Sequence, residues 1–127
     1  SAGYLKANHM ETSLFVSQVN GTYKIAKLPI QAQYAPVYTI TVFDYNEDGN
    51  EDVLLCGNNS HFKLRLGSIK ASYGILLKGD GKGDFQYIDQ MTSGFKLRGD
   101  IRSALKFDSS MLFGVNQGSL IFYKRKE

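Results

Sequence analysis

Apolar residues alternate with polar ones at a period of two through most of this 127-residue chain. A period of two puts successive side chains on opposite faces of an extended strand, whereas an amphipathic helix needs a period of about 3.6. The segment 38–43 shows this alternation in β-branched and aromatic residues, which favour strands. No segment longer than a few residues carries a helical stripe. The pattern therefore predicts an all-β protein.

Turn-forming residues divide the alternating segments into hairpins. Asn20-Gly21 is a strong hairpin signal, because both residues tolerate the positive φ that a primed turn needs. A second glycine-rich turn covers 79–83, and thirteen glycines against two prolines suit short strands joined by tight turns. The expected strands are 14–18, 22–26, 38–43, 53–56, 73–78, 85–88, 103–107, 111–115 and 120–124.

A weak internal repeat relates these hairpins to one another. Leu14 and Leu76 precede equivalent turns and lie 62 positions apart, as do Tyr23 and Phe85, which follow the turns. The segment 42–44 likewise matches 106–108. The repeating unit is therefore about four strands long.

This repeat predicts how the single all-β unit, 1–127, is organised. Segment 12–28 is the trailing hairpin of one four-stranded unit, 38–91 is a complete unit, and 101–124 holds three strands of a further one. Antiparallel four-stranded units in series are the blades of a β-propeller, and a ring needs about four to eight of them. We therefore expect a partial β-propeller that forms the C-terminal fragment of a larger protein. The alternative is a small β-sandwich whose hairpins merely look alike.

The residues between the third and fourth expected strands read D-x-N-x-D-G-x-x-D. Oxygen side chains at alternate positions of a tightly curled loop converge on one point, and Ca²⁺ prefers six to eight oxygen ligands. Gly49 permits the sharp turn, while Glu47 and Glu51 fall at outward positions. The alternative is an Asx-rich turn without an ion. The candidate calcium ligands are Asp44, Asn46, Asp48, Asn50 through its carbonyl, and Asp52.

An EF-hand begins with a similar run of residues but needs a bidentate Glu at its twelfth position. Here that position is Leu55, inside an apolar strand, and strands rather than helices are expected on both sides. The pattern therefore favours a loop between two adjacent strands.

The loop and its flanks resemble the calcium-binding loops of FG-GAP repeats in integrin α-chain propellers and of the related bacterial VCBS repeats. Segment 79–85 resembles the G-D-G-x-G-x-F hairpin of VCBS-like repeats. The resemblance implies a structural Ca²⁺ held by the five residues listed above, between the first two strands of a blade. It departs at 108–110, where the third unit has too short a turn for an ion. It departs again at Lys82, which makes Asp80 and Asp84 turn formers rather than ligands.

Enzymatic motifs are missing from the sequence. His9 and His61 are the only histidines, and no G-x-S-x-G, P-loop or histidine-rich metal set is present. Two S-x-x-K matches, at 60–63 and 103–106, lack the partner motifs that would give them meaning. We expect a non-enzymatic protein, and a hydrolase is the least favoured function.

A binding module is the alternative to a purely structural scaffold. The connection 57–72 is the longest in the chain, and long loops often carry contact residues. A protein or a glycan is the ligand class we expect for it, and the alternative, which we favour slightly, is a solvated loop that covers a sheet edge. Its candidate contact residues are Asn58, Asn59, His61, Phe62, Lys63 and Arg65.

Composition restricts the partners and the setting. A net charge of +3 without a concentrated basic stripe argues against nucleic acid, and no apolar run approaches a membrane span of about 20 residues. The single cysteine, Cys56, excludes an internal disulfide. A weak calcium site suits an extracellular, cell-surface or periplasmic protein. The expected partners are the remaining blades of the parent chain or another copy of this chain.

Overall fold

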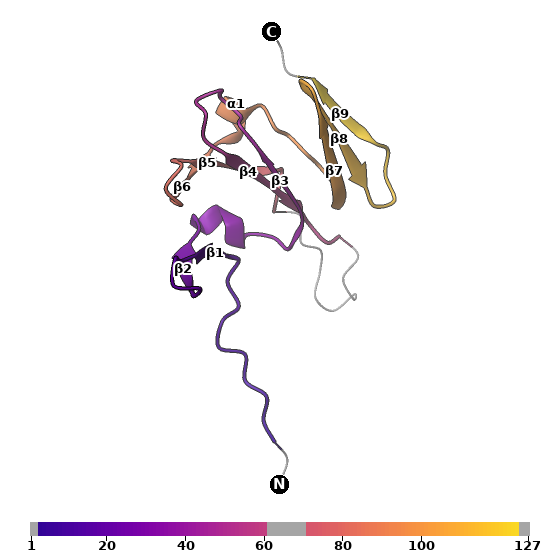
Figure 1. Cartoon of the computed structure of the whole chain (residues 1–127). Helices are drawn as coiled ribbons and strands as arrows, with labels where there is room; N and C mark the ends of the chain where they lie inside the picture. Colours follow the sequence, from indigo (N-terminus) through magenta and orange to yellow (C-terminus); the bar gives the residue numbers. More distant parts are fainter. Residues whose placement is uncertain (1–2, 61–70, 125–127) are drawn as a thin grey trace.

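The computed structural model describes residues 3–60 and 71–124, which form three antiparallel β-sheets with very little helix (Figure 1). The all-β, antiparallel class predicted from the sequence is confirmed, and each strand lies within two residues of its expected range. The elements are β1 (Ser13–Ser17), β2 (Tyr23–Lys27), η1 (Ile30–Gln33), β3 (Val37–Phe43), β4 (Asp52–Gly57), β5 (Ile75–Gly79), β6 (Phe85–Ile88), α1 (Gln90–Ser93), β7 (Ile101–Phe107), β8 (Ser110–Val115) and β9 (Ile121–Lys124).

The strands of each sheet follow one another in chain order. The first sheet is the β1–β2 hairpin, the second runs β3-β4-β5-β6, and the third runs β7-β8-β9. Short turns can join antiparallel neighbours directly, so a meander of this kind needs no crossover. The turn at Asn20-Gly21 is where the sequence predicts it, but it is not the expected primed turn, because Gly21 takes φ +79° whereas Asn20 does not have a positive φ. The Asn20 side chain instead accepts from the Thr22 amide over 3.1 Å, and the Gly21 amide donates to the Gln18 carbonyl over 3.0 Å.

The middle sheet is covered on both faces. On one face, Leu54 and Leu76 belong to a core that continues into Phe113 of the third sheet. On the other face, Leu55 and Leu77 pack with Ala32 of η1. Figure 1 shows this sheet between the η1 and β1–β2 segments and the β7–β9 sheet. Burial of both faces explains why β4 is a continuous apolar run instead of an alternating one.

Two short helical turns interrupt the strands, and the sequence patterns did not predict them. At α1 the Asp89 side chain caps the turn by accepting from the amides of Met91 and Thr92, and Gly94 ends it in the left-handed conformation at φ +75°. Both residues are local signals of a helical turn, but four residues are too few to show a helical period. No helix within 3–60 or 71–124 has the length and apolar character needed to cross a membrane.

Candidate functional site

The predicted calcium loop connects the end of β3 to the start of β4. Asp44 directly follows β3, and Asp52 is the first residue of β4. Gly49 takes φ +84°, a left-handed conformation in which glycine carries no steric penalty. The loop therefore turns sharply at the position where the sequence predicts it.

Asp44 holds the loop in its curled shape. Its two carboxylate oxygens accept the backbone amides of Asp48 over 3.2 Å and of Gly49 over 2.8 Å. The carboxylate is therefore directed toward the loop's own backbone, as in an Asx-type turn.

Asp48 joins this loop to β5. Its carboxylate accepts the side-chain amide of Asn46 and the backbone amide of Asn50, each over 2.9 Å. It also forms an ion pair with the Lys78 ammonium over 2.8 Å. The Lys78 hydrogen bond is the main cause that lowers the pKa of Asp48, and the same contact raises the pKa of Lys78.

Asp52 is wholly buried at the base of the loop. One oxygen accepts the amide of Tyr45 over 2.8 Å, and the other accepts the amide of Gly79 in β5 over 2.9 Å. A buried carboxylate with two such partners anchors the loop to the sheet. Sequence spacing predicts Asp52 as a ligand but not its bond to Gly79, which is 27 residues away.

Asn50 faces the β5–β6 turn. A Cβ atom added at Gly81 would lie 2.4 Å from its Oδ1, so the two turns are in close contact. In that second turn Asp80 accepts the amides of Lys82 and Asp84, over 2.8 and 3.1 Å. These are the bonds of a turn-forming carboxylate.

The donor set suits Ca²⁺ by its chemistry, since carboxylate, amide and backbone oxygens are the ligands this ion prefers. Within residues 3–60 and 71–124, however, no three acidic, histidine or cysteine side chains gather closely enough to hold a metal ion. Ion binding at this loop would require Asp48 to exchange its Lys78 contact for the ion, and Asp44 to share oxygens now bonded to backbone amides.

The structure separates the residues predicted for the contact loop. Asn58 is only 2% exposed, and its side chain bonds the amide and carbonyl of Ser72 and the carbonyl of Gly99. It therefore ties the start of the connection to its end. Asn59 donates from its side chain to the Tyr38 hydroxyl over 3.3 Å. His61, Phe62, Lys63 and Arg65 lie outside the described residues.

Buried Asp100 and half-buried Arg102 form a polar cluster that sequence patterns missed. The Asp100 carboxylate accepts from both the amide and the hydroxyl of Ser60. Arg102 donates to the Asn58 carbonyl over 2.8 Å, and its guanidinium carbon lies 3.7 Å from the centre of the Tyr38 ring. These partners are about 40 or more residues apart, so no local motif could have indicated them.

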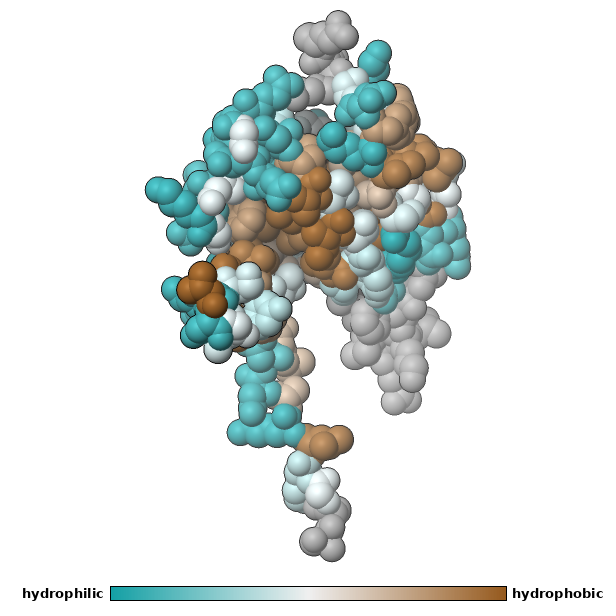
Figure 2. Space-filling model, viewed as in Figure 1, coloured by the Kyte–Doolittle hydropathy of each residue, from teal (hydrophilic) through white to brown (hydrophobic). Residues whose placement is uncertain are grey.

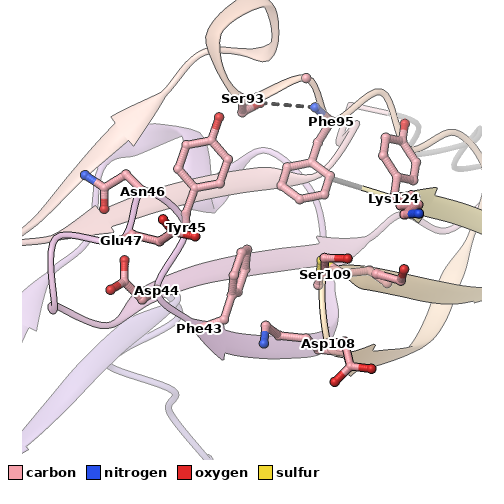
Figure 3. Close-up of a pocket in the computed structure, with 15 residues that line it drawn as sticks. Phe43, Asp44, Tyr45, Asn46, Glu47, Ser93, Phe95, Asp108, Ser109 and Lys124 are labelled. Carbon is pink, nitrogen blue, oxygen red and sulfur yellow. Dashed lines mark hydrogen bonds between the residues drawn. The ribbon is translucent and has the colours of Figure 1, made fainter. Parts of the chain in front are cut away.

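A groove of about 910 Å³ opens beside loop 44–52, between the second and third sheets. Figure 3 shows the rings of Phe43, Tyr45 and Phe95 along it, with the loop on one side and Asp108 and Lys124 on the other. The groove thus combines aromatic surface with charges of both signs. The only sequence feature that indicates this groove is the high aromatic content of the chain.

Neither a family model, nor a curated protein, nor a solved structure matches the chain in comparisons with known proteins.

Proposed function

We propose that this chain is a non-enzymatic scaffold of stacked β-sheets, of the FG-GAP/VCBS type, in which loop 44–52 binds a structural Ca²⁺. The observation that carries the proposal is the anchoring of Asp52. This carboxylate is wholly buried and bonded to both the loop and β5, so a bound ion would connect two parts of one sheet. When bound, the ion would supply a cross-link among the loop oxygens and offset their negative charge.

The charge of the loop supports an ion of this kind. Five carboxylates lie within the nine residues 44–52, and Lys78 offsets one charge by its contact with Asp48. A divalent cation would reduce the repulsion among the remaining carboxylates, and its double charge would be preferred over a monovalent cation added beside the Lys78 ammonium. Extracellular modules with this chemistry bind Ca²⁺ at about 10⁻⁴–10⁻³ M, so we propose an extracellular, cell-surface or periplasmic setting.

The packing of the sheets supports blades over a sandwich. A two-sheet sandwich has one core between its sheets, whereas the middle sheet here has separate cores on its two faces. Sheets that stack in series, each covered by the next, are typical of a propeller.

Thermal unfolding in EDTA, in CaCl₂ and in MgCl₂ tests the calcium site. An ion that binds only the folded chain, and is present at a concentration of about a hundred times its dissociation constant, adds about 2.7 kcal/mol to the free energy of unfolding. We expect a rise in Tm with calcium and little change with magnesium, and the rise should vanish in the double variant Asp44→Ala, Asp48→Ala.

Asp89→Ala is the matched control for this experiment. Asp89 is exposed like Asp48 and accepts two backbone amides like Asp44, but it caps α1 outside the loop. It should lower the baseline Tm and keep the full calcium response. No calcium response in the unmodified chain, or an equal response in the double variant, would contradict the calcium site.

A second candidate function is ligand binding in the groove of Figure 3. Half-buried aromatic rings beside acidic groups are suited to stacking against a sugar ring or a peptide side chain. Glycan and peptide arrays would test it. Tyr45→Ser should abolish a signal that Tyr34→Ser, a change at an exposed tyrosine outside the groove, leaves intact. Equal loss in both variants would argue against the groove.

A further inference from the structure

The second and third sheets have the same strand register. In β3–β4, Thr41 pairs with Leu54, and the pairing shifts between Val37 and Thr39. In β7–β8, Leu105 pairs with Leu112, and the pairing shifts between Ile101 and Ser103. Every pair of the first ladder has its counterpart in the second, including the irregularity. The sheets can therefore be compared position by position.

One face of each sheet can be defined by this comparison. We call the side of the middle sheet that packs against the third sheet its front face, and the opposite side its back face. The equivalent sides of the third sheet and of the β1–β2 hairpin take the same names. The front face of the middle sheet carries Phe43, Leu54 and Leu76. The equivalent positions of the third sheet are Phe107, Leu112 and Phe122.

These equivalent residues differ sharply in burial. Leu54 and Leu76 are fully buried beneath the third sheet. On the third sheet Phe107 and Phe122 are 44% and 58% exposed, and their rings pack together with centroids 6.2 Å apart. Leu112 between them is half-buried, and Leu105, which pairs with Leu112 on the same face, is 59% exposed. Figure 2 shows hydrophobic surface in this region of the molecule. The front face of the third sheet thus has the side chains of a sheet interface but no sheet on it.

The β1–β2 hairpin has an uncovered apolar surface on its back face. Its pairs Phe15–Ile25 and Ser17–Tyr23 match the pairs Leu77–Tyr87 and Gly79–Phe85 of β5–β6, 62 residues later in every case. On the middle sheet these back-face residues pack into a core. Their counterparts on the hairpin, Phe15, Tyr23 and Ile25, are 47–68% exposed.

We propose that the front face of the β7–β9 sheet docks the back face of the β1–β2 hairpin of a second copy of this chain. The contact would repeat between molecules the front-to-back packing that the middle and third sheets make within one chain. It joins two different surfaces, so the association is head to tail and each added copy presents a free front face again. The docking does not depend on the calcium site.

Two variants test the direction of the contact. Phe122→Asp places a charge on the front face, and Ile25→Asp places one on the back face, so each variant should be monomeric alone. Mixed in equal amounts they should form a 1:1 dimer, because one intact front face and one intact back face remain. The unmodified chain should gain mass steadily with concentration. Sedimentation velocity in EDTA measures the mass of the unmodified chain, of each variant and of their mixture. Protein concentrations from about 1 μM to about 1 mM cover the dissociation constants of weak to moderate contacts.

Met91→Asp is the matched control, because Met91 is highly exposed but lies on α1, away from both faces. It should self-associate like the unmodified chain. An unmodified chain that stays monomeric throughout the concentration range would overturn the proposal. So would a mixture of the two variants that stays monomeric, or self-association of Phe122→Asp alone. Circular dichroism of each variant must match the unmodified chain, and Leu105→Asp replaces Phe122→Asp if the latter is unfolded.

Discussion

Removal of the Asp52 carboxylate should strongly destabilise this chain even without calcium. The side chain is fully buried, and it is the acceptor for the amides of Tyr45 and Gly79. Asp52→Ala removes both acceptors and leaves no side-chain oxygen to replace them. The bond from Gly79 lies in the interior, whereas the bond from Tyr45 is partly accessible to water.

The expected loss follows from the cost of a buried donor without an acceptor. That cost is about 1–3 kcal/mol for each group. The Gly79 amide should cost toward the upper end of this range and the Tyr45 amide toward the lower end, because water can reach the latter. The two together predict a loss of about 2–5 kcal/mol in the free energy of unfolding. A small domain has about 5–15 kcal/mol in total, so the effect is large.

Urea unfolding in EDTA, followed by circular dichroism, measures this loss because the chain contains no tryptophan for fluorescence. Asp52→Asn keeps one carbonyl acceptor in nearly the same volume but turns its NH₂ donor toward the other backbone amide, so it should also lose stability, though less than Asp52→Ala. A loss below about 0.5 kcal/mol for Asp52→Ala, the level of an ordinary surface change, would refute the reasoning. So would an equal loss in both variants.

Three further predictions concern individual side chains. Lys78→Met should tighten calcium binding at loop 44–52, because it removes the cation that now holds Asp48; unchanged or weaker affinity by calorimetry would count against competition between Lys78 and the ion. Burial raises the pKa of Cys56 to about 12, so its thiol should resist iodoacetamide at pH 8 in the folded chain and react in urea; rapid labelling of the folded chain would contradict its burial. Hydrogen bonds from Thr92 lower the pKa of Asp89 in the folded chain, so its contribution to stability is present above the unfolded pKa of 3.8 and disappears as the pH falls through the lower folded value. Asp89→Asn should therefore reduce the loss of Tm on acidification, and a parallel Tm–pH curve would rule this out.

Local features of the sequence determine most of the secondary structure. The period of two is a property of neighbouring residues, so it indicates strands without knowledge of what they pack against. Gly21 and Gly49 act in the same way, since a left-handed backbone conformation is available to glycine whatever its distant neighbours are. The antiparallel class follows from these short turns, and it is confirmed.

The contacts between residues far apart in the chain could not be predicted from the sequence, because they depend on how the sheets pack. Asp48 meets Lys78, and Asn58 meets Gly99, across 30 and 41 residues, and no motif spans such intervals. Asn58 is a polar residue in a long connection, so its sequence suggested exposure, but the structure places it in the interior as a tie between two segments.

The clearest contrast lies between equivalent positions of the repeat. Leu76 and Phe122 are both apolar and occupy the same place in their sheets, and the alternation pattern gives both the same expectation of burial. Leu76 is covered by the next sheet and Phe122 is not. Hydrophobic burial depends on which surfaces meet, and that is a property of the assembled sheets, not of any residue or its neighbours in the chain.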